Sequence, residues 1–116
     1  MAGWSFGAWV ALRHALTDPR IAALALLGIP LAAARSPGRP LPSLAELEGL
    51  SIPVLFVAGD GDQYCPLPEM ENLAGWIPRG AVTVVPGTDH FFGRREREVA
   101  ALVGEWIEGE LAPQTS

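Results

Sequence analysis

Short segments of continuous apolar residues are the feature of this sequence that most constrains its fold. They are "IAALALLGI" (residues 21–29), "VLFVAG" (54–59) and "AVTVV" (81–85). An apolar run of this length that ends in a turn is typical of a parallel strand covered on both faces. Parallel strands also need long connections between them, because the chain must cross back over the sheet before the next strand begins.

Segments with helical spacing lie around these runs, at residues 6–16, 68–77 and 94–111. In the last of them the apolar side chains form one stripe: Val99, Leu102, Val103, Trp106 and Ile107. The alternation predicts an α/β fold with three layers and a partial parallel sheet, in one domain over residues 1–116. The stretch at 31–50 begins rich in proline and serine and is predicted to be an irregular excursion in place of a cap, and 112–116 a frayed tail.

The bulk composition excludes several partners. The net charge of −5 argues against nucleic acid, because its binders carry clustered positive charge. The longest apolar run, residues 21–34, is shorter than the ~20 residues of a spanning helix and contains Gly28 and Pro30, so we expect no membrane segment. A single cysteine, Cys65, excludes an internal disulfide and suits a reducing compartment, so we expect a cytoplasmic protein.

Three polar residues lie where chemistry is expected in such a fold. Ser5, in the G-x-S-x-G sequence "GWSFG", opens a helix, whereas Asp62 and His90 follow two of the predicted strands. Reactive groups gather beyond the carboxyl ends of parallel strands. The order Ser, Asp, His predicts Ser5 as nucleophile, His90 as its base and Asp62 as the acid that orients the imidazole. The backbone N–H of Phe6, the next residue, is the predicted oxyanion donor.

Each assignment has an alternative. Serine favours the N-cap of a helix, which would explain Ser5 without catalysis. Asp60 and Asp89 compete with Asp62, although Asp60 is interpreted as a turn former and Asp89 adjoins His90 too closely to reach the far ring nitrogen.

The remaining candidates are interpreted as structural. His14 lies about 13.5 Å along the helix from Ser5, too far for a hydrogen bond. Cys65 is expected to be a small buried residue, and Trp4 a packing residue that could also line a substrate pocket. No cysteine and histidine cluster has metal spacing and no glycine loop suits a phosphate, so we expect neither metal nor cofactor.

Three segments resemble the second half of an α/β-hydrolase: "GWSFGAWVAL", "IPVLFVAGDGDQYCP" and "VPGTDHFFG". The sequence is most similar to small, lidless bacterial α/β-hydrolases related to dienelactone hydrolase. The resemblance covers nearly the whole chain. It implies a serine hydrolase of small carboxylic esters or related acyl compounds, acting through an acyl-enzyme, with Ser5, Asp62 and His90 as its catalytic residues.

The N-terminus departs from this family. Its members have roughly half their sheet before the serine motif, whereas only "MAG" precedes it here. We therefore expect an N-terminally truncated domain in which the strand that presents Ser5 is absent. Residues 21–27 would then form an exposed edge suited to homodimer formation. The alternative function is a catalytically incompetent fragment that needs an N-terminal half or a partner chain to complete the sheet and the oxyanion hole.

Overall fold

The computed structural model describes residues 1–31 and 42–111, in which the strands form one parallel sheet. The strands lie in the sequential order β1-β2-β3-β4. Their bounds are Ala2–Trp4 (β1), Leu24–Leu27 (β2), Val54–Gly59 (β3) and Gly80–Val85 (β4). The α/β fold with a parallel sheet is therefore confirmed, and the three predicted strands are all present.

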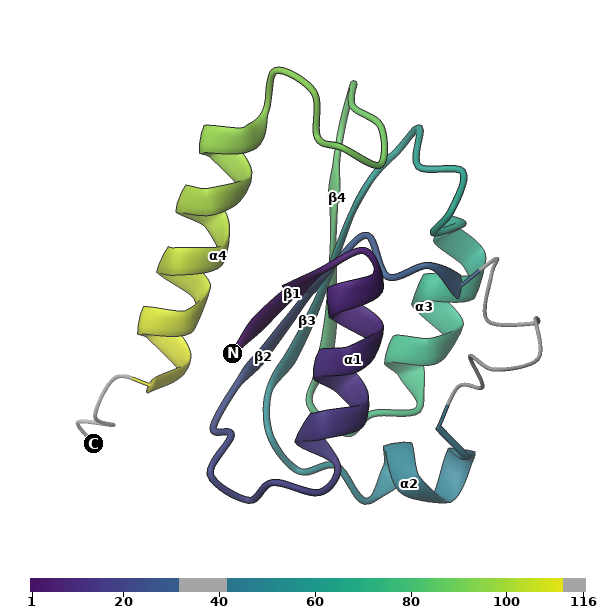
Figure 1. The fold of residues 1–116 in the computed structure, drawn as a ribbon, viewed down its shortest axis with the longest axis vertical. Helices are drawn as coiled ribbons and strands as arrows, with labels where there is room; N and C mark the ends of the chain where they lie inside the picture. The colour runs from purple at the N-terminus through teal and green to yellow at the C-terminus, as the bar shows by residue number, and fades with distance from the viewer. Residues whose placement is uncertain (32–41, 112–116) are drawn as a thin grey trace.

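Helices cover both faces of the sheet. They span Phe6–Ala15 (α1), Leu44–Glu48 (α2), Leu67–Gly75 (α3) and Glu96–Leu111 (α4). Figure 1 shows α1, α2 and α3 on one face and α4 on the other, which makes the predicted three layers. Of the excursion predicted at 31–50, residues 32–41 lie outside the described residues, as does the tail at 112–116. None of the described helices has the length and apolarity to span a bilayer.

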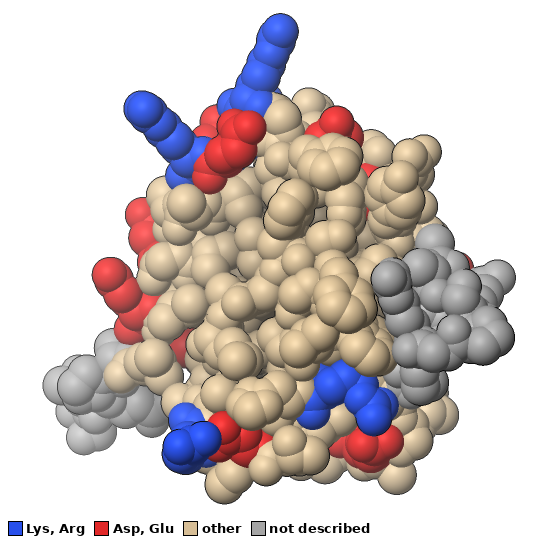
Figure 2. Space-filling view, viewed as in Figure 1, with Lys and Arg blue, Asp and Glu red and all other residues tan. Residues whose placement is uncertain are grey.

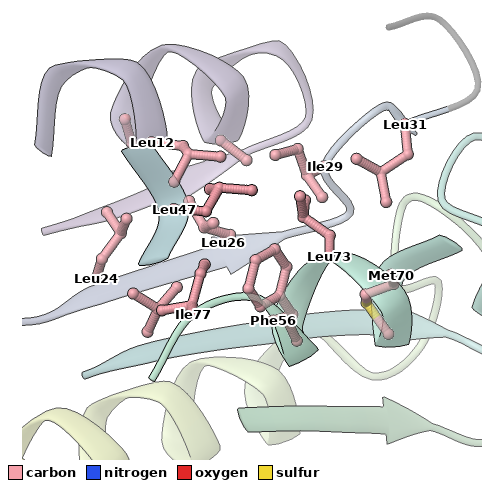
Figure 3. Packing of buried hydrophobic residues seen from close by; sticks show 14 of the residues in the cluster. Leu12, Leu24, Leu26, Ile29, Leu31, Leu47, Phe56, Met70, Leu73 and Ile77 are labelled. Atoms are coloured by element: carbon pink, nitrogen blue, oxygen red, sulfur yellow. The ribbon is translucent and has the colours of Figure 1, made fainter. Parts of the chain in front are cut away.

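The larger core lies between the sheet and helices α1, α2 and α3. Figure 3 shows Phe56 of β3 facing Leu26 of β2 and Met70 of α3 within it, and each is fully buried. All of β3 is buried, because it has a neighbouring strand on each edge and helices over both faces. A smaller core lies under α4, and the apolar stripe predicted for this helix packs there.

The expectation that the strand before Ser5 is absent is wrong. Strand β1 has three residues and pairs in parallel with β2, with Gly3 opposite Leu26. So short a strand is held because the bonding continues past both of its ends. After the strand, the N–H of Ser5 donates to the Leu27 carbonyl at 2.8 Å, and before it Met1 makes two further bonds to the chain around β2. The N–H of Ala25 donates to the Met1 carbonyl at 3.0 Å, and the N-terminal ammonium donates to the Ala23 carbonyl at 3.1 Å.

The edge predicted at residues 21–27 is corrected by the same finding. Strand β2 begins at Leu24 and lies between β1 and β3, so both of its edges are paired. The outer edge of the sheet on this side belongs to β1 instead. A homodimer through residues 21–27 would require β1 to leave the sheet.

Candidate active site

Ser5 occupies the junction between β1 and α1 in a strained backbone conformation. Its φ is 54° and its ψ is −123°, a region that residues other than glycine seldom adopt. The backbone on each side holds it there, because its N–H donates to the Leu27 carbonyl at 2.8 Å and its carbonyl accepts from Ala8 at 2.9 Å. Ser5 stands at the N-cap of α1, but its side chain makes no capping bond. The Ser5 hydroxyl therefore does not cap the helix, and its hydrogen bond is made to another part of the chain.

The hydroxyl of Ser5 is bonded to His90, which follows β4. The Ser5 Oγ lies 2.8 Å from His90 Nε2. The imidazole is buried, stacks on Trp4 with ring centroids 5.9 Å apart, and meets the edge of Tyr64 at 4.8 Å. The Trp4 indole N–H also donates to the His90 carbonyl at 3.2 Å. These contacts fix both the ring and its backbone.

The other ring nitrogen faces Asp62. His90 Nδ1 lies 2.9 Å from Oδ2 and 3.1 Å from Oδ1 of this carboxylate. A carboxylate only accepts, so Nδ1 carries the proton, and in the neutral imidazole Nε2 is then the acceptor for the Ser5 hydroxyl. Asp62 is itself buried and held, since Oδ1 accepts the backbone N–H groups of Tyr64 at 2.8 Å and Cys65 at 3.0 Å.

The side chains of the two competing aspartates, Asp60 and Asp89, bond to backbone groups of loops. Asp60 Oδ1 accepts the backbone N–H of Gly87 at 3.0 Å and ties the loop after β3 to the loop after β4. Asp89 Oδ1 accepts the N–H of Phe91 at 3.0 Å within its own loop. Of the three carboxylates, Asp62 is the one bonded to His90.

The side chains of His14 and Cys65 take no part in the hydrogen bonds that join Ser5, His90 and Asp62. His14 pairs with Asp18 at 3.0 Å on the far end of α1. Cys65 is fully buried, and burial, with smaller contributions from the Asp62 and Glu69 charges, raises the pKa of its thiol to about 12. The thiol is therefore protonated near neutral pH. Within the described ranges no three acidic, histidine or cysteine side chains gather as a metal site.

Aromatic side chains surround the site, and sequence reasoning found only one of them. A cavity of about 310 Å³ lies beside the exposed Trp4, with a largely apolar lining of Trp4, Leu27, Phe91, Phe92, Glu96, Val99 and Ala100. Tyr64 and Phe91, whose rings contact the imidazole in a T-shaped arrangement, were missed. Their place in the sequence was the available signal, since Tyr64 lies two residues after Asp62 and Phe91 directly follows His90.

The two motif glycines differ in their surroundings. A Cβ on Gly3 would lie 2.7 Å from the Gly7 carbonyl carbon and 2.8 Å from the Ala8 Cα, so only glycine lets β1 approach α1 this closely. A Cβ on Gly7 would meet nothing within 4 Å. Of the two motif glycines, only Gly3 therefore has to lack a side chain.

Comparison with known proteins places the chain in a family. The sequence model of the family described as "Alpha/beta hydrolase domain" matches residues 1–109. No curated protein matches the sequence.

Several solved structures have the same fold, and three of them illustrate the likeness. Est1E from Butyrivibrio proteoclasticus is 21% identical with a TM-score of 0.78, over 97% of this chain and 61% of Est1E. An alpha-beta serine hydrolase homologue from Coxiella burnetii is 28% identical with a TM-score of 0.70, over 91% of this chain and 47% of its own. A serine hydrolase from Cycloclasticus zankles is 13% identical with a TM-score of 0.79, over 97% and 64%. The chain thus spans less than two thirds of the length of each.

The glycine contacts predict opposite effects for two alanine substitutions. Gly3→Ala should lower the free energy of unfolding by about 1–3 kcal/mol, because its methyl would overlap the backbone of α1. Gly7→Ala is the matched control and should raise it by up to about 1 kcal/mol, since alanine favours a helix over glycine. Urea unfolding followed by tryptophan fluorescence measures both. Equal stability of Gly3→Ala and the parent chain would contradict the close approach of β1 to α1.

Proposed function

The chain belongs to the α/β hydrolase family, and from that premise we propose that it is a serine hydrolase of small carboxylic esters or related acyl compounds. One observation carries the proposal. Ser5 Oγ, His90 and Asp62 form a continuous hydrogen-bonded row, with 2.8 Å between Oγ and Nε2 and 2.9 Å between Nδ1 and Oδ2. A hydroxyl, a base and a buried acid in this arrangement make an activated nucleophile.

In the proposed mechanism Ser5 Oγ attacks the acyl carbon while His90 Nε2 takes its proton. Asp62 keeps Nδ1 protonated and stabilises the imidazolium that forms. Collapse of the tetrahedral intermediate breaks the bond to the leaving alcohol, which receives the proton from Nε2, and leaves the acyl group on Ser5. Water then attacks the acyl-enzyme with His90 again as base, releasing the acid and restoring Ser5.

The negative charge of the intermediate needs a donor beside Ser5. Phe6 is the first residue of α1, so its backbone N–H lies at the positive end of the helix dipole. We assign Phe6 as an oxyanion donor on this ground. A donor aimed at the developing charge is typically worth about 10²–10³ in kcat.

Labelling with a fluorophosphonate tests the nucleophile. The parent chain should react at Ser5, because the probe is attacked by an activated serine, and Ser5→Ala should abolish the reaction. Ser51→Ala, which removes an exposed serine between α2 and β3, is the matched control and should label like the parent. Mass spectrometry of the labelled peptide locates the adduct. An adduct elsewhere, with Ser5 unmodified, would contradict the assignment.

The acid can be tested by a set of three isosteric changes. Asp62→Asn should reduce ester hydrolysis by about 10⁴-fold, since the wrong imidazole tautomer would be favoured. Asp60→Asn and Asp89→Asn are the controls and should retain most activity, because these side chains bond to loop N–H groups. Hydrolysis of p-nitrophenyl acetate measures all three. If Asp60→Asn or Asp89→Asn is the damaging change, Asp62 is not the acid.

A second candidate function is a chain that is catalytically incompetent alone and needs an N-terminal half of a hydrolase domain. Within the described residues β1 pairs with β2 alone, and Met1, Trp4 and Val10 are exposed near that edge. Figure 2 shows mainly uncharged residues over the side that bears β1 and α1, with charged residues toward its margins. A further strand and helix would cover this side and could bring a second oxyanion donor.

The state of the isolated chain distinguishes the two candidates. If it needs a second half, sedimentation at low micromolar concentration should show association or aggregation, and the fluorophosphonate should not react until the N-terminal half of a related hydrolase is supplied. A sharp monomer that unfolds cooperatively and labels at Ser5 would contradict the second candidate. A chain that stays unlabelled even with that half would contradict the first.

A further inference from the structure

We propose that Gly28 is a positioning residue, whose missing side chain lets the His90–Asp62 pair settle against the end of β2. Its effect on activity rests on the proposed function, whereas its effect on the pair itself does not. Gly28 lies outside the serine motif and the two loops that supply Asp62 and His90. It follows β2 directly, with its backbone buried.

The backbone at Gly28 is fixed directly under the bonded pair. Its N–H donates to the Val57 carbonyl of β3 at 2.7 Å, and its φ is +57°. A Cβ built there would lie 3.1 Å from Asp62 Oδ2 and 3.1 Å from His90 Nδ1. These are the two atoms joined by the 2.9 Å hydrogen bond of the pair. A methyl carbon at these distances is closer than ordinary van der Waals contact, so at least one of the two side chains would have to move.

Neither side chain has an easy way to move. Asp62 is held through Oδ1 by the N–H groups of Tyr64 and Cys65. The imidazole of His90 is held by its stacking on Trp4 and by the ring edge of Tyr64. A substituent on Gly28 would therefore lengthen the bond from Nδ1 to Oδ2, or swing Nε2 away from the Ser5 hydroxyl.

Two further substitutions separate crowding from backbone strain. Gly87 also has a positive φ, +71°, but the nearest neighbour of its Cβ would be the Arg95 Nη2 at an ordinary 3.7 Å. Gly87→Ala thus carries the same kind of backbone strain as Gly28→Ala without the contact to the pair. Gly28→Asn carries the contact with less strain, because asparagine tolerates positive φ better than alanine.

The experiment uses the full chain and two readouts. One is the low-field proton resonance of His90 Nδ1–H, which reports its hydrogen bond to Asp62 in nuclear magnetic resonance spectra. The other histidine, His14 of α1, pairs with Asp18 in the turn after the helix and serves as an internal reference. The second readout is the rate of Ser5 labelling by the fluorophosphonate. Thermal unfolding by circular dichroism checks that each variant is folded.

Gly28→Ala and Gly28→Asn should both lose or shift the His90 resonance and leave the His14 signals in place. Their labelling rates should fall, by less than the ~100-fold that a displacement of about 1 Å in a catalytic group costs, because contacts of 3.1 Å require a smaller shift of the pair. Gly87→Ala should keep the resonance and label like the parent chain. If the parent chain is not labelled even with the N-terminal half of a related hydrolase supplied, but the resonance follows this pattern, the positioning role stands and the hydrolase proposal fails.

Three results would overturn the positioning role. One is an unchanged His90 resonance in folded Gly28→Ala. Another is the same loss in Gly87→Ala, because strain alone would then explain the effect. The third is failure of both Gly28 variants to fold while Gly87→Ala folds, since Gly28 would then serve the fold as a whole.

Discussion

A row of three backbone hydrogen bonds along the carboxyl edge of the sheet is the constraint on which the candidate site depends. The N–H of Ser5 donates to the Leu27 carbonyl at 2.8 Å, that of Gly28 to Val57 at 2.7 Å, and that of Asp60 to Val85 at 3.1 Å. Each bond starts at the first residue after one strand and ends on the next strand, at its last residue for Leu27 and Val85 and two residues before the end of β3 for Val57. These bonds fix the carboxyl ends of neighbouring strands to one another, so the loops that carry the site leave the same edge of the sheet in the order of the strands.

This shared edge explains how side chains that are far apart in the sequence come within hydrogen-bond distance. Ser5 follows β1, Asp62 follows β3 and His90 follows β4, so the His90 loop has to reach back past the ends of β3 and β2 to the serine. The residue at the end of β2 must therefore leave space for the imidazole and the carboxylate above it, and Gly28, which has no side chain, is that residue. The same geometry buries the Asp62 carboxylate against the imidazole of His90, which is tolerable because each polar atom has a partner. Among the described residues no buried side-chain nitrogen or oxygen lacks a hydrogen bond.

Sequence reasoning succeeded where the signal was local. The runs that became β2 and β3 are apolar throughout, the run that became β4 is interrupted by Thr83, and the stripe on α4 has a clear period. It failed for β1, whose residues Ala2–Trp4 are too few to show a pattern and whose pairing comes from β2, over twenty positions away. The contacts of Gly28 were equally out of reach, because they join three loops that meet only in the folded chain. The different surroundings of Gly3 and Gly7 are also a property of packing that the motif alone does not contain.

The position of Ser5 is held by two strands, β1 and β2, that are supported to different degrees. On one side stands β2, anchored by the fully buried β3. On the other stands β1, a strand of three residues that is bonded along one edge among the described residues. The close contact of Gly3 with α1 ties this short strand to a helix of ten residues, and the Trp4 indole ties its end to the His90 loop. The strained backbone of Ser5 is thus held by packing on α1 and by the loop it serves, and any strand added outside β1 would strengthen the weaker of its two supports.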